Sequence, residues 1–563
     1  MLFKMIREGF VCLTLMVLIA LSGCGGGSSP TPTPLAPTPP ARPTKEEAFQ
    51  FLEQATFGPT ENEVNAVISL GFEGWIDKQI EQTASLQLPY LESLERPNNL
   101  RQLQDERVGI WFRNAIQESD QLRQRVAFSL SEIMVVSEIG ALRDATYSLA
   151  SYYDMLSRNA FGNFRDLIED VTLHPAMGVY LSMLGNEKPD PKKNIRPDEN
   201  YAREMMQLFT IGLVQLNIDG TEKLDSEGKP LSTFDQEIVE GFARVYTGWN
   251  YADATSFGKA KRDDANQIKA MQLYSSKHDQ GPKTLLNGVT LPANRSGAQD
   301  LNSALDNVFQ HSNVGPFIAK QLIQRIVTSN PSPAYVARIT AIFNDNGQGV
   351  RGDLEAVVKK ILLDAEARPS SETNASGKLK EPLLRVTQLW RAYNAETPNN
   401  DYRFYYCYSG GSCANSLSAR EPYIVFGQGP LQSPSVFNFF SPFYAPSGII
   451  QNSEFVAPEF QIATEYQNTH LTNFFFSQIF LLNSQTPGLK NRDVYINIDE
   501  EILLAGNTTT LINKVADKLL AGNISGTLTS QVGTLLEQIP ASNAKERAAT
   551  AIYLIASSPE FAR

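Results

Sequence analysis

Apolar residues recur at helical spacing through most of this chain. In residues 45–56, for example, Ala48, Phe51, Leu52 and Ala55 fall on one face of a helix. No alternation of strands with helices and no glycine-rich phosphate loop can be seen. We therefore expect a mainly α fold, one large multi-helical domain with long irregular loops rich in Pro, Gly and aromatic residues. Periodicity, capping residues and Gly or Pro breaks predict further helices over residues 61–70, 74–81, 99–117, 119–136, 145–158, 163–173, 177–184, 236–246, 299–310, 314–329, 333–344, 353–363 and 383–393.

The helix predicted over residues 198–213 has a polar stripe in an otherwise apolar surface. Asn200, Glu204 and Gln207 share this stripe, and Arg203 is adjacent to it. A charge left unpaired in a protein interior costs about 3–5 kcal/mol, so each of these groups needs a partner if the helix is buried. The stripe is therefore either an internal salt-bridge network that fixes helix packing or a ligand-binding or catalytic site.

The helix predicted over residues 236–246 offers partners for that stripe. Glu240 and Arg244 lie four residues apart, so they share one face of this helix. We expect Arg244 to pair with Glu204, and Glu240 to pair with Arg203. Such pairing would satisfy the stripe without any ligand.

A small β-hairpin is predicted over residues 217–231. This stretch contains Asp219-Gly220 and Glu227-Gly228, dipeptides that are typical of tight turns.

Residues 427–448 are too rich in Pro and Gly to form one helix. They also carry several aromatic side chains. These would either pack as an irregular part of the core or line a groove for an apolar or carbohydrate surface. The aromatic residues are Phe437, Phe439, Phe440, Phe443 and Tyr444.

His174 is the first of two histidines of interest. Pro175 disfavours helical geometry at His174 and so places its ring at a turn. It is either a hydrogen-bonded structural residue or a ligand or acid–base group. A polar loop over residues 185–197 separates it from the helix of Glu204, so the two side chains could lie near each other.

His278 belongs to a second candidate loop, residues 272–288, together with Asp279 and Lys283. An adjacent His-Asp pair can bind a metal or tune an imidazole for proton transfer. It can equally cap a turn and leave the His on the surface. Because loops often carry function, we expect this loop to be where chemistry or binding meets solvent.

The N-terminus has the features of a lipoprotein export signal. Lys4 and Arg7 precede an apolar run over residues 10–21 that is too short for a stable membrane-spanning helix. The sequence Leu-Ser-Gly-Cys that follows resembles a lipobox, so Cys24 is expected to carry the lipid and to begin the mature chain. No Asp follows Cys24, which by analogy with Gram-negative sorting favours the outer membrane.

Three segments follow from these features: a signal peptide over residues 1–23, a lipidated Cys and linker over 24–44, and the helical domain over 45–563. The linker is rich in Pro and Thr and should act as a semi-rigid spacer between lipid and domain. Membrane attachment is thus expected through the lipid anchor.

Cys407 and Cys413 are the two cysteines left after the signal and the lipidated Cys24. A Ser-Gly-Gly turn lies between them. In an oxidising compartment this pair predicts a local disulfide, and a metal pair is the alternative.

Composition narrows the classes of partner. The formal net charge is −12, with 49 basic and 61 acidic residues, and no basic run is present. We therefore expect no nucleic-acid partner.

Six segments, in this order, resemble the bacterial family catalogued as domain of unknown function 1800 (DUF1800). This resemblance implies a large, mainly helical exported protein without an established activity, often encoded near a sulfatase-like exported family that is a possible partner. Many members carry a Trp- and His-containing segment where this chain has residues 128–136, which weakens a shared metal-enzyme interpretation. The segments are LEQATFGPTENEVNAVISLGFEGWIDKQI, HPAMGVYL, DENYAREMMQLFTIGL, GFARVYTGW, KHDQGPKTLLNG and PSVFNFFSPFYAPSG, and the matching family positions are Asn200, Arg203, Glu204, Arg244, Gly248, Trp249, His278, Asp279 and Lys283.

Two functional hypotheses remain. The first is an envelope-anchored scaffold or binding module that acts with another exported protein or a surface polymer. The second is a metal-dependent or acid–base hydrolase-like enzyme, with Glu204, His278 and Asp279 as catalytic residues or ligands and Arg203 or Arg244 as an anion clamp. The sequence identifies no cofactor and no particular metal.

Overall fold

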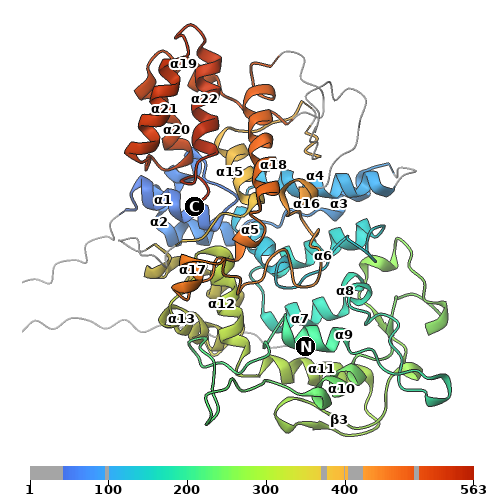
Figure 1. Cartoon of the computed structure of the whole chain (residues 1–563). Helices are drawn as coiled ribbons and strands as arrows, with labels where there is room; N and C mark the ends of the chain where they lie inside the picture. Colours follow the sequence, from blue (N-terminus) through green and yellow to red (C-terminus); the bar gives the residue numbers. More distant parts are fainter. Residues whose placement is uncertain (1–41, 96–99, 369–376, 399, 404–421, 487–493) are drawn as a thin grey trace, which may run out of the picture. The chain divides into compact units, whose positions relative to one another are not determined.

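The computed structural model describes residues 42–95, 100–368, 377–398, 400–403, 422–486 and 494–563. Residues 42–563 form one compact unit. The described residues are mainly α-helical, and the regular strands among them form two small antiparallel sheets (Figure 1). The predicted mainly α, multi-helical fold class is therefore confirmed.

The first helices form where the sequence supplies caps and apolar faces. Thr44 and Glu47 make a reciprocal capping box at the start of α1, and Thr60 caps α2, which covers both helices predicted between residues 61 and 81. This part of the chain contains α1 (Lys45–Ala55), α2 (Glu61–Ile80), α3 (Leu88–Ser93), α4 (Leu100–Gln117), α5 (Gln121–Ser131), α6 (Thr146–Asn159), α7 (Phe164–Leu173) and α8 (Pro175–Tyr180).

The middle of the chain combines helices with both sheets. Strand β1 (Trp249–Asn250) pairs with β2 (Gln272–Leu273), and β3 (Lys283–Thr284) pairs with β4 (Thr290–Leu291). The helices here are α9 (Asn200–Gln207), α10 (Gln236–Val245), α11 (Gly297–Phe309), α12 (Val314–Ile326), α13 (Pro333–Asn344), α14 (Leu354–Leu363) and α15 (Pro382–Ala392).

Helix α10 and strand β3 approach each other unusually closely at Gly241. A Cβ atom at this position would lie 1.9 Å from the carbonyl oxygen of Thr284. Only glycine leaves room for this contact, which holds α10 against the loop that carries His278.

The last helices pack largely on one another. Helices α19 to α22 form a group of their own, shown in red in Figure 1. This part contains α16 (Pro422–Phe426), α17 (Ile449–Asn452), α18 (Glu465–Phe476), α19 (Asp499–Leu504), α20 (Thr508–Leu519), α21 (Gly526–Glu537) and α22 (Ala544–Ala556). One continuous hydrophobic core runs from α1 to the end of the chain, with Trp111 and Trp390 among its largest members.

Two local predictions need correction. Helix α9 is shorter than the predicted 198–213, because the chain turns out of the helix after Gln207 and Gly212 closes it with a positive φ of 72°. Residues 214–232 make turns at both predicted dipeptides, but isolated antiparallel bridges, rather than regular strands, join the segments between them.

Several predictions lie outside the described residues. These are the signal peptide, the lipidated Cys24, most of the linker and the pair Cys407 and Cys413. They stay predictions.

Candidate functional site

The loop predicted to carry chemistry has an exposed outer part, but its His278, Asp279 and Lys283 are buried. His278 is 0% exposed, and both of its ring nitrogens face oxygen atoms. Its Nδ1 lies 3.0 Å from the carbonyl oxygen of Thr247, and its Nε2 lies 3.1 Å from Oδ2 of Asp300. The expectation that this loop meets solvent at His278 is therefore wrong. The reason is that α11 supplies Asp300, which the sequence reading did not connect to the loop.

Arg244, Asp279 and Lys283 complete this arrangement, which we call the His278 cluster. Arg244 donates two hydrogen bonds to the Asp279 carboxylate, at 3.0 and 2.8 Å. Lys283 Nζ donates to the carbonyl oxygen of Asp279 at 2.7 Å and to Oδ2 of Asp300 at 2.7 Å. Arg295 donates to the other oxygen of Asp300 at 2.7 Å. Each carboxylate of the cluster is therefore paired with at least one cation.

The acid groups of the His278 cluster are held in their charged form. Burial alone would raise the pKa of Asp279, but the hydrogen bonds from Arg244 and Gly281 outweigh it and lower that pKa. For Asp300 the hydrogen bonds from Lys283 and Arg295 outweigh burial in the same way. The cluster fixes α10, α11 and the intervening loop to one another.

Glu204 is buried, with 7% of its surface exposed, but the prediction that Arg244 pairs with it is wrong. Arg244 pairs with Asp279, and Arg203 pairs with Glu199 at 3.1 Å instead of with Glu240. Within the described part of the chain, Oε2 of Glu204 has no hydrogen-bond partner, and burial raises the pKa of this carboxyl group. None of the contacts found there joins Glu204 to the His278 cluster.

Asn200 and His174 have local roles. Asn200 is exposed, and its backbone N–H donates to Oδ1 of Asp198 at 2.8 Å, just before α9. His174 is buried and accepts from the backbone N–H of Ala176 at 3.2 Å, so it caps α8. Its Nε2 lies 3.3 Å from Oγ of Ser151, and burial lowers the pKa of the ring to about 3.

A second charged cluster, missed by the sequence reading, lies where α5, α12 and the start of α15 meet. We call it the buried charge network. Lys378 Nζ lies 3.1 Å from a carboxylate oxygen of Glu381 and 3.1 Å from one of Glu459. Arg325 Nε lies 3.9 Å from Glu132. The members are Arg125, Glu132, Arg325, Lys378, Glu381 and Glu459, and none has a side chain more than 9% exposed.

Glu132 and Glu381 are neighbours within this network, because the Gln428 side-chain amide donates to both, at 3.3 and 2.6 Å. Burial and the neighbouring Glu381 raise the pKa of Glu132. Burial would also raise the pKa of Glu381, but Lys378 and Arg125 outweigh it and hold that pKa below its usual range. The two carboxyl groups therefore share one proton near neutral pH.

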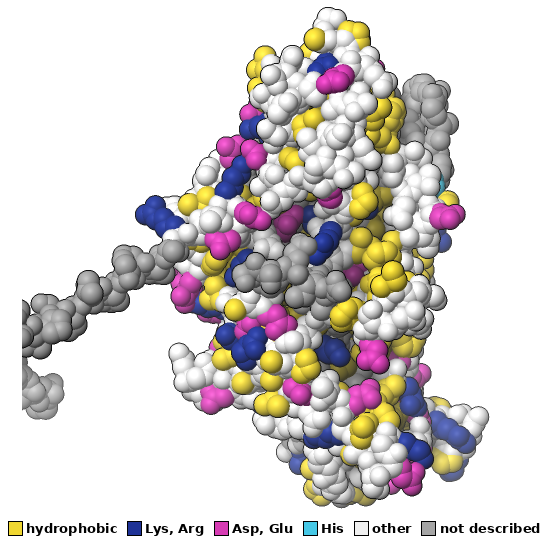
Figure 2. All heavy atoms as spheres, turned by 60° about the vertical axis from the view of Figure 1, so that its left-hand side comes forward, with side chains coloured by type: hydrophobic (Ala, Val, Ile, Leu, Met, Phe, Trp, Pro, Cys, Tyr) yellow, Lys and Arg dark blue, Asp and Glu magenta, His cyan; other side chains and the backbone are white. Residues whose placement is uncertain are grey.

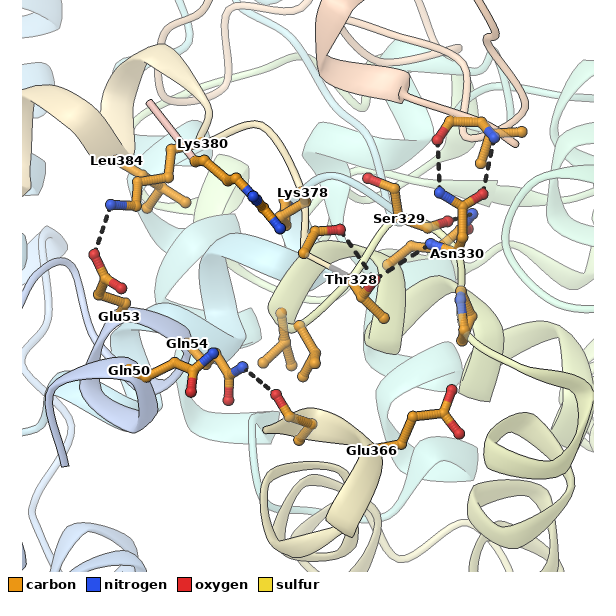
Figure 3. Close-up of a pocket in the computed structure, with 18 of the residues that line it drawn as sticks. Gln50, Glu53, Gln54, Thr328, Ser329, Asn330, Glu366, Lys378, Lys380 and Leu384 are labelled. Carbon is orange, nitrogen blue, oxygen red and sulfur yellow. Dashed lines mark hydrogen bonds and ion pairs between the residues drawn. The ribbon is translucent and has the colours of Figure 1, made fainter. Parts of the chain in front are cut away.

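A cavity of about 980 Å³ opens beside the buried charge network. Gln50 and Gln54 of α1 form one side, residues 328–330 after α12 form another, and Lys378 and Lys380 extend across it (Figure 3). Arg125 lines the cavity although it is only 1% exposed, so the cavity reaches the network.

The walls of this cavity are fixed by hydrogen bonds. Lys380 pairs with Glu53 at 2.6 Å, and the Asn330 amide bonds both ways with the backbone of Val456, at 2.9 and 2.8 Å (Figure 3). Phe443, from the aromatic segment, also lines the cavity and is 68% exposed. That segment is mixed, since Phe440 is buried and Phe437 is exposed.

Among the residues that the structure describes, no group of three or more His, Cys, Asp or Glu side chains is arranged to hold a metal ion. None of the helices in this part has the length and hydropathy that crossing a bilayer requires. On the face shown in Figure 2, acidic and basic side chains are interspersed.

Comparison with known proteins gives one match. A family described as "Protein of unknown function (DUF1800)" matches residues 50–563, which is nearly all of the described body. No curated protein and no solved structure matches the chain.

Proposed function

We propose that this chain, which belongs to the DUF1800 family, is an exported lipoprotein whose folded body binds an envelope component in the cavity beside the buried charge network. The occupant would be another exported protein, such as the sulfatase-like partner that the family resemblance implies, or a surface polymer. The lipid on Cys24 would hold the body at the membrane, in a Gram-negative bacterium at the outer one.

The observation that carries this proposal is the cavity itself. It is about 980 Å³ in volume, which is within the range of ligand sites in proteins. Its lining comes from segments far apart in the chain, and hydrogen bonds such as those of Asn330 fix these segments before any ligand arrives. A site with fixed walls loses little conformational entropy on binding.

The catalytic alternative gains less support from the geometry. It needs His278 and Asp279 to present free atoms to a substrate. Both nitrogens of His278 and both oxygens of Asp279 are engaged by protein groups. We therefore assign the His278 cluster a structural role.

Lipid attachment is tested with a pair of cysteine variants. In cells fed a labelled fatty acid, we expect the wild type and Cys12→Ser to carry label and to fractionate with membranes, because Cys12 lies within the predicted signal peptide. Cys24→Ser should carry no label and leave the membrane fraction. Label that persists in Cys24→Ser would refute the anchor.

Binding is tested with the body 42–563, which forms one compact unit. Isolated cell envelopes should sediment the wild-type body. Gln50→Trp fills the cavity from α1 and should abolish sedimentation, whereas Gln538→Trp on the exposed end of α21 should not. Equal sedimentation of the two variants would show that the cavity is not the binding site.

A further inference from the structure

Residues 441–461 form a compact lobe beside the cavity, which we call the 441–461 lobe. The backbone N–H of Ala457 donates to the carbonyl oxygen of Tyr444 at 2.8 Å. The backbone N–H of Ser441 donates to Oε1 of Gln461 at 2.8 Å. These two hydrogen bonds join the ends of the lobe, as in the compact surface loops that frequently carry function.

The outer surface of this lobe carries apolar side chains that face solvent. Ile449, on α17, is 86% exposed, Phe443 is 68% exposed and Phe460 is 43% exposed. A Cβ atom at the neighbouring Gly448 would meet no atom within 4 Å, so the chain at the start of α17 stands free of the residues around it. Isolated exposed apolar residues are ordinary, whereas several gathered in one lobe are typical of an interaction site.

Few charged residues accompany these side chains. Glu454 and Glu459 are the charged residues of the lobe, and the sequence has no Lys or Arg from residue 421 to residue 489. Glu459 is buried and pairs with Lys378 at 3.1 Å, which leaves Glu454 as the exposed charge of the lobe. The lobe therefore has no cation of its own to attract anionic headgroups, and its attraction to another surface comes from its apolar side chains.

The lobe and the beginning of the folded body border one cavity. Phe49 and Gln50, in the first turns of α1, line this cavity together with Phe443 and Val456 of the lobe. Even a fully extended chain covers only about 3.3–3.6 Å per residue, so the start of α1 stays within roughly 75 Å of Cys24. A lipid on Cys24 therefore keeps the cavity and the lobe close enough to touch the bilayer.

We propose that the 441–461 lobe contacts the lipid surface of the membrane to which Cys24 is attached, with Ile449 and Phe443 inserted among zwitterionic headgroups. This inference rests on the lipid anchor of the proposed function, and it assigns an orientation to the anchored body. Three side chains bury less apolar surface than one acyl chain, which by itself gives only marginal membrane binding. The lobe therefore does not attach the body but orients it, with the cavity at the membrane surface.

The test is co-sedimentation of the body 42–563, which lacks Cys24, with phosphatidylcholine vesicles. Lipid is in millimolar excess because the lobe alone binds weakly. We expect reversible binding that high salt does not release, since no ion pair with a headgroup is involved. Ile449→Asp should weaken this binding about tenfold or more, the effect of losing one buried side chain of this size. The matched control is Leu503→Asp on α19, because Leu503 is 85% exposed and lies outside the lobe.

Insertion is measured with one introduced tryptophan. The four native tryptophans are all buried, so a quencher carried by the lipid does not reach them. Ile449→Trp should lose fluorescence in vesicles whose acyl chains carry bromine, whereas Leu503→Trp should not. A tryptophan at position 449 that brominated lipid leaves unquenched would overturn the inference.

The outcomes separate the lipid contact from the proposed function. If the wild-type body does not bind vesicles, or if Ile449→Asp binds as well as Leu503→Asp, the lipid contact is overturned. If Cys24 carries label and Gln50→Trp prevents envelope sedimentation in that case, the anchor and the cavity stand without the lobe. If Cys24→Ser keeps its label, the anchor fails, and the comparison of Ile449→Asp with Leu503→Asp still decides whether the lobe binds lipid.

Discussion

Glu132 and Glu381 share one proton, which makes the cost of removing their charges non-additive. In Glu132→Gln the charge stays on Glu381, 3.1 Å from Lys378. In Glu381→Gln it moves to Glu132, 3.9 Å from Arg325. Each single variant should therefore cost about 1 kcal/mol, the net contribution of one typical hydrogen bond.

In the double variant, Glu459 is the one carboxylate of the network that remains to balance its three cations. An uncompensated buried charge costs about 3–5 kcal/mol, so the double variant should exceed the sum of the two single ones. We expect a coupling free energy of about 1–3 kcal/mol, within the range for residues in direct contact.

Urea unfolding of the body at pH 7 measures this coupling, with the fluorescence of the buried Trp111 and Trp390 as the signal. The control is Glu227→Gln, whose exposed ion pair with Lys229 should contribute less than about 1 kcal/mol. Costs of the two single variants that add up to the double within about 0.5 kcal/mol would refute the shared proton. So would a Glu132→Gln variant as unstable as the double.

Two further predictions concern packing and pH. Gly241→Ala places a methyl group 1.9 Å from the carbonyl oxygen of Thr284 and should cost about 3 kcal/mol or more in thermal or urea unfolding, whereas Gly506→Ala, which meets no atom within 4 Å, should be tolerated. His174 has a folded-state pKa of about 3 against an ordinary value of 6.5, so the neutral ring stabilises the fold fully above pH 6.5. As the pH falls from 6.5 towards 3, the wild type should lose about 1.4 kcal/mol of stability per pH unit relative to His174→Asn. This variant keeps an acceptor for the Ala176 N–H but does not titrate. Equal pH dependence of the wild type and His174→Asn would contradict that account.

Local signals in the sequence were sufficient to predict most helices. Caps such as Thr44, Thr60 and Asp235 are set by residues within a few positions of each helix start, so the sequence pattern exposes them directly. Helix ends were less predictable. The 198–213 pattern remains apolar after Gln207, but the chain leaves the helix there. The Thr210 hydroxyl donates to the carbonyl oxygen of Met205, and Gly212 adopts a positive φ of 72°.

Only part of the candidate site could be predicted from the sequence. His278, Asp279 and Lys283 were placed together in one loop from the sequence, but Arg244, which was expected to pair with Glu204, pairs with Asp279 instead. Asp300, the shared partner of His278 and Lys283, lies on another helix and carries no local signal.

The buried charge network was missed for the same reason. Arg125 and Glu132 lie in a stretch that reads as an ordinary amphipathic helix. Their partners are far along the chain: Arg125 donates to the carbonyl of Arg325, 200 residues away. The spacing of apolar residues in the sequence gives no information about a contact between residues so far apart.

The central claim is that the cavity is occupied by an envelope component in the cell. Site-specific photo-crosslinking in living cells tests it most directly, with a photoreactive amino acid at Gln50 in the cavity of the full-length chain. The control position is Leu503, which is 85% exposed on α19 and does not line the cavity. We predict an adduct from position 50 that is absent from position 503. The absence of an adduct at position 50, or the same adduct at both positions, would contradict the account.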